Sequence, residues 1–350
     1  MDLLNRKLEQ ALQYLKVNLS EDVFDEEIRM ANFAGGNLPD YENPLQAAFY
    51  MLKYAKYYAL EYYWMYDLAL QILSHKTDIK VPVNYSFGCG SMVDGLSYLY
   101  AHSKLQEDFG EDYSITGKLY YSAIDLVEWP HTALLNLGET EDMVVKKYLD
   151  KGMVKFWDEM KSFHGNMMFF PKLLSENLDH VVGDSSIIDS FCEELVEANM
   201  RSKFILLCVS YRGINTYEED AVKTRKIIDA LLEKGYEIED YSLDDYDWIC
   251  RDYFEMYDEE QKVFCSRDDV RVDYKEYSDF KVPGEIIRYL MDGDLLEDFC
   301  RYYDGRNGMR TASEVCRACR QDCDLLAKPR TSINSGDDHT CFQILAFRRN

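Results

Sequence analysis

Two short segments with the pattern of consecutive parallel strands constrain the fold of this chain most. The first is an apolar strand that ends in the turn Gly88-Cys89-Gly90, and helical periodicity begins directly after it. Glycine has no side chain, so such a turn lets the backbone approach a bound ligand closely. The second segment, residues 119–124, ends in Asp125, and a carboxylate at the end of the next parallel strand can bind both hydroxyls of a ribose. Together they predict an α/β fold that binds a nucleoside.

From residue 81 onward, strand patterns alternate with helical patterns. Strands are predicted over residues 83–87, 119–124, 153–157, 166–170, 203–210, 236–241 and 340–348. Helices are predicted over residues 91–105, 142–149, 187–200 and 218–234, the last of which stops at Gly235. Alternation of this kind indicates a mostly parallel sheet with helices on both faces.

The pattern divides the chain into three parts. They are a helical extension, residues 1–80; a cofactor-binding core, residues 81–243 with 339–350; and an inserted subdomain, residues 244–338. A structureless loop as long as the third part would be unusual in a compact domain. In the extension, Asn43-Pro44 opens a run over Leu45–Leu73 that is rich in Tyr, Ala, Leu and Met. This run is either a lid over a substrate cavity or a packing helix, and its aromatic stripes favour packing.

The order of these elements, with a closing strand after a long insertion, resembles the class I S-adenosylmethionine-dependent methyltransferases. The resemblance implies a Rossmann-like core of seven strands, in which the last strand runs antiparallel between the fifth and the sixth. The turn over Phe87–Ser91 looks like the family's glycine motif, and Phe169–Glu176 also resembles uncharacterised bacterial methyltransferase-like proteins. The cofactor contacts that the resemblance implies are Gly88, Cys89, Gly90, Ser91, Asp125, Leu126, Asp158, Phe170 and Pro171.

Three positions depart from the family pattern. Ser86 stands where an acidic residue is common, and no further glycine follows Gly90 within the turn. Asp125 lies well beyond the usual distance of about 20 residues after the glycines, so an additional loop over residues 108–117 is required. A nicotinamide-binding Rossmann domain is the alternative, but it needs a third glycine where this chain has Val93.

A methyltransferase does not need a recognisable catalytic triad. The cofactor carries its own activated leaving group, so the protein mainly aligns the acceptor and excludes water. Lys172 and Glu176 follow the fourth strand, where acceptor and cofactor meet in this family, and are the candidate catalytic residues. Lys172 either holds a carboxylate of the acceptor or is an ordinary loop lysine, solvated or paired with Glu176. His131 and His164 are alternative bases, although single histidines more often serve as ordinary hydrogen-bonding residues.

The cysteines near the C-terminus form a second candidate site. Cys316, Cys319 and Cys323 place a Cys-x-x-Cys pair beside a third thiol, which suits a tetrahedral metal. Cys341, or alternatively His339 or Cys300, would complete a zinc site or, less favoured, an iron–sulfur site that fastens the insertion to the core. The simpler interpretation is three free thiols on one helical face.

Charge and composition narrow the function classes. The net charge of −25 disfavours nucleic acid as a partner, although the arginines within residues 301–330 keep RNA or DNA methylation as a third hypothesis. Methyl transfer to a small molecule or to a peptide or protein is the first hypothesis. A non-catalytic nucleotide- or partner-binding module on the same fold is the second.

The sequence also bears on location. It has neither an apolar run long enough to span a membrane nor an export signal. Ten cysteines in such a chain indicate reduced thiols and a cytoplasmic protein. Oligomeric state is not specified by any pattern in the sequence.

Overall fold

The computed structural model describes residues 1–29, 40–150, 152–160, 162–175, 186–211, 217–239, 256–258, 263–265, 277–292, 295 and 341–350. The chain forms two compact units. Unit 1 comprises residues 1–59, 129–135 and 273–332, and unit 2 comprises residues 60–128, 136–272 and 333–350.

A central sheet organises unit 2. Its strands are β1 (Val83–Phe87), β2 (Leu119–Ile124), β3 (Met143–Tyr148), β4 (Met167–Phe170), β5 (Phe204–Tyr211), β6 (Glu237–Glu239), β7 (Met256–Asp258), β8 (Val263–Cys265) and β9 (Cys341–Arg348). The order across the sheet is β3-β2-β1-β4-β5-β9-β8-β7, and β6 also pairs with β9. The first five strands are parallel. The order reverses direction between β1 and β4, which makes that position the topological switch point.

The closing strand β9 is antiparallel to both of its neighbours in the core. It pairs with β5 from Phe204↔Arg348 to Tyr211↔Cys341, and β6 pairs with its carboxyl-terminal half. The last strand therefore lies between the fifth and sixth strands, as the family arrangement implies. Among the described residues the sheet has nine strands where seven are expected, because β7 and β8 continue it beyond the amino-terminal half of β9.

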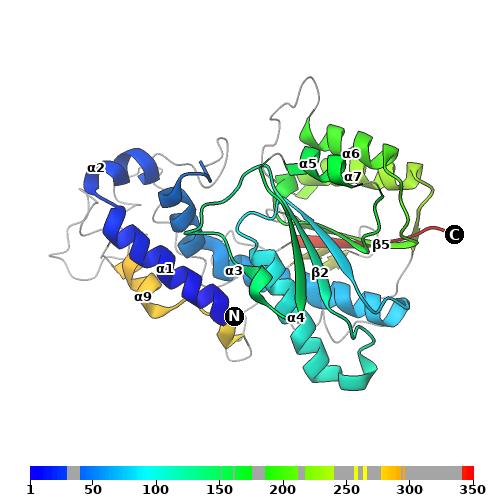
Figure 1. Ribbon diagram of the computed structural model, residues 1–350, viewed down its shortest axis with the longest axis horizontal. Coiled ribbons are helices and arrows are strands. Elements are labelled where there is room, and N and C mark those ends of the chain that lie inside the picture. The colour runs from blue at the N-terminus through cyan, green and yellow to red at the C-terminus, as the bar shows by residue number, and fades with distance from the viewer. Residues whose placement is uncertain are drawn as a thin grey trace. The chain divides into compact units, whose positions relative to one another are not determined.

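The described helices are divided between the two units. They are α1 (Asp2–Asn18), α2 (Glu21–Val23), α3 (Pro44–Lys76), α4 (Val93–Phe109), α5 (Gly152–Glu159), α6 (Ile187–Glu197), α7 (Tyr217–Glu233) and α9 (Gly284–Ile287). Within unit 2, α5, α6 and α7 cover one face, and α4 with the later part of α3 covers the other (Figure 1). Gly235 follows α7 at φ 80° and its N–H donates to the Leu232 carbonyl at 2.9 Å, which ends the helix as expected.

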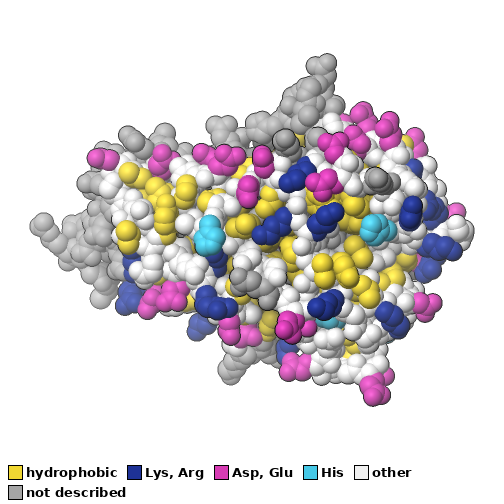
Figure 2. Space-filling view, viewed as in Figure 1, with side chains coloured by type: hydrophobic (Ala, Val, Ile, Leu, Met, Phe, Trp, Pro, Cys, Tyr) yellow, Lys and Arg dark blue, Asp and Glu magenta, His cyan; other side chains and the backbone are white. Residues whose placement is uncertain are grey.

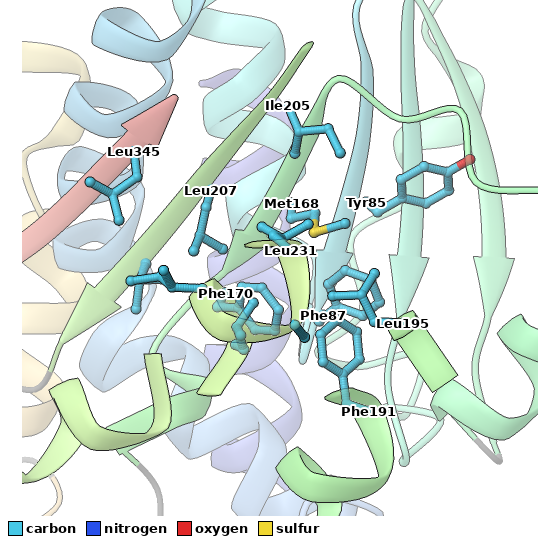
Figure 3. Close-up of a cluster of buried hydrophobic side chains, with 14 of the residues drawn as sticks. Tyr85, Phe87, Met168, Phe170, Phe191, Leu195, Ile205, Leu207, Leu231 and Leu345 are labelled. Carbon is cyan, nitrogen blue, oxygen red and sulfur yellow. The ribbon is translucent and has the colours of Figure 1, made fainter. Parts of the chain in front are cut away.

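The main core lies between the sheet and α5, α6 and α7. Successive residues of a strand point to opposite faces, so Tyr85 and Phe87 enter this core while Asn84 and Ser86 face the other side. Phe87 and Phe170 stack at 5.1 Å between ring centroids, and Phe191 of α6 meets both edge-on. Figure 3 shows these rings with aliphatic side chains from β5, α6 and α7.

Two neighbouring predictions were wrong. Residues 142–149 are expected to be helical but contain β3, and the expected strand over 153–157 lies within α5. At the sheet edge only Met143 and Tyr148 of β3 are buried, so its apolar pattern is weak. Six parallel register pairs with β2, from Leu119↔Met143 to Ile124↔Tyr148, supply the backbone bonds that fix it as a strand.

Helix α3 begins where Asn43-Pro44 predicts. The Asn43 side chain accepts the N–H of Leu45 at 2.9 Å, and proline fits the first helical position because its missing N–H would have no helical partner there. Almost every residue of α3 is buried or half-buried, which supports the packing interpretation. The first half of α3 belongs to unit 1, as does α1. The buried residues of α1 are Leu4, Lys7, Leu8, Ala11, Leu12 and Leu15. Among the described helices, none is long and apolar enough to span a bilayer.

Candidate functional site

The turn after β1 needs glycine for its backbone and for its close packing. Gly88 has φ 76° and Gly90 has φ 52°, both in the left-handed region. A Cβ at Gly88 would lie 2.7 Å from Leu173 Cδ1, on the segment that follows β4. Met92, which is fully buried, also adopts a left-handed conformation at φ 63° directly before α4. Non-glycine residues in this region are strained, and such strain concentrates at functional sites.

Backbone bonds fasten this turn to the end of β2. The N–H groups of Gly88 and Cys89 both donate to the Ile124 carbonyl, at 2.8 and 3.2 Å. The N–H of Gly90 donates to the Asp125 carboxylate at 2.6 Å, and the N–H of Val127 donates to its other oxygen at 3.0 Å. The structure therefore brings the glycine turn and the acidic residue into direct contact.

The Asp125 carboxyl group is enclosed although the residue as a whole is half-buried. Burial raises its pKa to about 6, and the bonds from backbone N–H groups oppose that shift. At neutral pH it is therefore a carboxylate held in place by two donors. Each carboxylate oxygen has two lone-pair sites, so the group retains capacity to accept further hydroxyls.

The other expected cofactor residues differ in exposure. The side chain of Leu126 is 42% exposed and Asp158 on α5 is exposed. Cys89 and Ser91 are buried, and burial raises the pKa of the Cys89 thiol. Phe170 belongs to the hydrophobic core, where its ring stacks on Phe87, so its ring is used in packing.

Lys172 is neither solvated nor a simple loop lysine. Its backbone is left-handed at φ 59°, and its buried ammonium lies 2.7 Å from the carboxylate of Glu61 on α3. The ammonium also donates to the Tyr211 carbonyl, and the Ser210 hydroxyl donates to the same Glu61 oxygen. This cluster, called here the Glu61–Lys172 pair, joins α3 to the carboxyl ends of β4 and β5.

A second buried carboxylate lies in the first turn of α4, just after the glycine turn. Asp94 accepts the hydroxyl of Tyr121 at 2.8 Å and that of Tyr66 at 3.2 Å. The Asn84 amide donates to the Tyr66 oxygen at 2.7 Å. Burial raises the pKa of Asp94 to about 6, while these hydroxyl donors lower it. The network ties β1, β2, α3 and α4 together beneath the candidate site.

Neither Glu61 nor Asp94 is among the residues expected from the sequence. The available signal is a carboxylate within an apolar stretch: Glu61 interrupts the aromatic run of α3, and Asp94 follows Val93 at the start of a helix whose next turns are mostly buried.

The remaining expected residues either have other described contacts or lie outside the described residues. Among the described residues, the His131 imidazole donates no hydrogen bond. Its backbone carbonyl accepts a hydrogen bond from Lys7 Nζ at 2.9 Å within unit 1. His164 is exposed, with Nδ1 3.0 Å from the Ser162 carbonyl. Glu176 lies outside the described residues, as do the expected metal ligands Cys316, Cys319 and Cys323 with their alternatives His339 and Cys300. Cys341 is buried in β9, and the described part of the chain contains no group of side chains suited to a metal.

Comparisons with known proteins give structural similarities only. No protein-family model and no curated protein matches the sequence. A loganic acid methyltransferase solved with SAH is similar over 90% of this chain and 98% of its own, with 8% identity and a TM-score of 0.35. The plantazolicin methyltransferase BpumL, solved with a monoazolic desmethylPZN analogue and SAH, covers 99% of this chain and 96% of its own, with 10% identity and a TM-score of 0.29. Similarities with TM-scores below 0.5 assign this chain neither a family nor a ligand.

Proposed function

We propose that the chain binds S-adenosylmethionine at the carboxyl edge of its sheet and transfers the methyl group to a small-molecule or peptide acceptor. The observation that carries the proposal is the bond from Gly90 N–H to the Asp125 carboxylate. It joins the turn after β1 to the acid after β2, beside the switch point where open α/β sheets bind ligands.

The hydrogen bonding of the turn favours a nucleoside without phosphates. A phosphate cradle needs N–H groups that point at the ligand. Here the N–H groups of Gly88 and Cys89 are taken by the Ile124 carbonyl, and that of Gly90 by Asp125. A carboxylate in this position would also repel a pyrophosphate, whereas it is compatible with the positive sulfonium of S-adenosylmethionine. The nicotinamide dinucleotide alternative is disfavoured on both counts.

The chain's own groups have distinct parts in this proposal. Asp125 accepts the ribose hydroxyls while it holds the turn, and the exposed Leu126 packs against the adenine. When bound, the cofactor supplies an activated methyl group with a neutral thioether as its leaving group. The Glu61–Lys172 pair fixes the backbone after β4, where the acceptor enters. Because the Lys172 ammonium is already bound by Glu61 and Tyr211, we assign it a positioning role rather than that of a base.

The non-catalytic module remains the second candidate, because no acid–base group with a clear catalytic geometry is found among the described residues. An acceptor with an acidic or already ionised nucleophile would not require one. Methyl transfer from labelled cofactor to small-molecule and peptide pools separates the two functions.

Calorimetric titration with S-adenosylhomocysteine tests the cofactor assignment. Asp125→Asn should weaken binding by about 10- to 100-fold, because it removes charge-assisted bonds to the ribose. Asp142→Asn is the matched control: it removes an exposed carboxylate that precedes β3 at the opposite edge of the sheet, and it should leave the affinity unchanged. Equal affinity in a folded Asp125→Asn protein would overturn the assignment.

A further inference from the structure

A hollow lies at the amino edge of the same sheet. Its volume is about 520 Å³, and it is formed by the end of α3, the following loop and the ends of β4, β5 and β9. Asn166 and Lys203 directly precede their strands, whereas Gly88 and Asp125 directly follow theirs. Because these strands are parallel, the hollow and the candidate cofactor site lie at opposite edges. A hollow of this size falls in the range of small-molecule sites.

The hollow is positively charged in a strongly acidic chain. Lys76, Lys203 and Arg348 line it with one carboxylate, Asp78, and the Glu239 carboxylate pairs with Arg348 beside it, so bases still outnumber acids there, while the whole chain carries a net charge of −25. In Figure 2, Lys and Arg side chains gather at the end of the visible face where Figure 1 places the C-terminus, and acidic side chains dominate the upper rim. A local reversal of charge of this kind concentrates anions at the surface.

Arg348 is held in position by its surroundings. Its Nε donates to Glu239 at 3.0 Å, one Nη2 hydrogen points to the Lys76 carbonyl at 3.4 Å, and the guanidinium lies 5.3 Å from the centroid of the Phe204 ring. A guanidinium has five N–H donors in a rigid fork, so these contacts orient the group and leave donors for a ligand. A preorganised arginine loses little freedom on binding an anion.

Asn166 adds a neutral donor to the same hollow. Its Oδ1 accepts the N–H of Val83 at 3.2 Å, and its amide NH₂ remains a donor on a residue that lines the hollow. The ammonium of Lys203 makes no ion pair with the described residues and is exposed. Donors therefore converge from β4, β5 and β9, three strands that are neighbours in the sheet.

The dipole of α3 does not explain this arrangement by itself. Basic residues are favoured in the last turn of a helix, where backbone carbonyls carry partial negative charge, and His75 and Lys76 occupy that turn. Lys203 and Arg348 belong to strands or their ends and are not placed by that effect.

We propose that this hollow binds a small phosphate-bearing molecule. A phosphate group with two negative charges and three acceptor oxygens matches the oriented Arg348 guanidinium, the exposed Lys203 ammonium and the Asn166 amide. The site is independent of the proposed methyl transfer, and it would place a phosphate-bearing substrate or effector at the edge remote from the cofactor.

Calorimetric titration with pyrophosphate at constant ionic strength tests the proposal. The full chain should show saturable binding with a Kd below 1 mM. Lys203→Gln, an exposed change that should not disturb folding, is expected to weaken binding at least fivefold. Lys104→Gln removes the same charge from an exposed pair with Glu107 on α4 and should change the affinity less than twofold.

Three results would overturn the proposal: no saturable binding below 1 mM, an equal loss in the two variants, or citrate binding as tightly as pyrophosphate. Titration of Lys203→Gln with S-adenosylhomocysteine keeps the two sites distinguishable, because this variant should bind that ligand as the unchanged protein does.

Discussion

The two edges of the sheet in unit 2 are built from the ends of the same strands, yet they differ in charge and in how that charge is held. At the carboxyl edge, Asp125 is bonded to backbone N–H groups, and Asp94 nearby is bonded to tyrosine hydroxyls. At the amino edge, Lys203 is exposed without an ion pair among the described residues, and Arg348 is exposed but oriented by Glu239 and the Phe204 ring. The first edge is organised by short-range bonds before any ligand arrives, which favours recognition by shape and hydroxyl groups. The second presents charge to solvent, which favours recognition by Coulombic attraction.

The largest expected effect concerns the buried charges at the carboxyl edge. Glu61→Gln leaves the Lys172 ammonium buried without its counter-charge and should lower the free energy of unfolding by about 3–5 kcal/mol. The matched control is Asp189→Asn, which removes an exposed pair with Lys226 and should cost less than about 1 kcal/mol. Urea unfolding measures both. A loss below 1 kcal/mol for Glu61→Gln would show that the pair does not hold this edge together.

Replacing glycine in the turn should have the next largest effect. Gly88→Ala combines a left-handed backbone with a contact 2.7 Å from Leu173 and should cost about 2–3 kcal/mol of unfolding free energy. Gly235→Ala has a similar φ of 80° but no atom within 4 Å of the new Cβ, so it should cost about 1–2 kcal/mol. Thermal unfolding compares the two. Only Gly88→Ala should also weaken binding of S-adenosylhomocysteine; weakening by both variants would indicate a general loss of structure.

The buried carboxylates predict a specific pH dependence. The pKa of Asp94 rises from 3.8 to about 6 on folding, so the folded state binds this proton more tightly than the unfolded state does. Its contribution therefore becomes less favourable as pH rises through this range, by about 1 kcal/mol between pH 5 and 7.5. Asp94→Asn should remove this contribution and leave those of Asp125 and Asp67, whose pKa values burial also raises, whereas Asp142→Asn should change none of them. Urea unfolding at the two pH values checks the sign: a stability difference between Asp94→Asn and the unchanged protein that does not vary with pH would contradict it.

The smallest expected effect concerns the adenine contact. The side chain of Leu126 is 42% exposed, so Leu126→Ala should change the unfolding free energy by about 0.5 kcal/mol or less. It should nevertheless weaken binding of S-adenosylhomocysteine about fivefold, since an apolar contact with the base is lost. Val144→Ala, on a β3 residue that is 41% exposed, should affect neither quantity. Unchanged binding in Leu126→Ala would remove this residue from the site.

Much of the fold could be predicted because several signals agree locally. The glycine turn follows a buried strand, Asn43-Pro44 starts α3 and Gly235 ends α7, and each depends on neighbours in the sequence. The exchange of strand and helix over β3 and α5 could not be predicted in this way. An edge strand such as β3 buries few side chains, and what makes it a strand is its pairing with β2, which is not visible in its own residues.

In the candidate site, the contact between the glycine turn and Asp125 was predictable from local signals of the same kind, and the Glu61–Lys172 pair was not. Gly90 and Asp125 stand at the ends of recognisable strands, so their meeting follows from the parallel order. Glu61 and Lys172 are 111 positions apart in the sequence. No local pattern connects them, so their pairing could not be predicted. Phe170 stands at the end of β4, a position that suggests the site, while its ring packs in the core because of the alternation along the strand.

The most direct test of the contrast between the two edges is hydrogen exchange of the full chain with saturating S-adenosylhomocysteine, read by mass spectrometry. We expect slower exchange in peptides covering residues 85–92 and 119–127, and unchanged exchange in peptides covering residues 75–80 and 203–206. Protection of the second set of peptides, or of neither, would contradict the assignment of the carboxyl edge as the cofactor site.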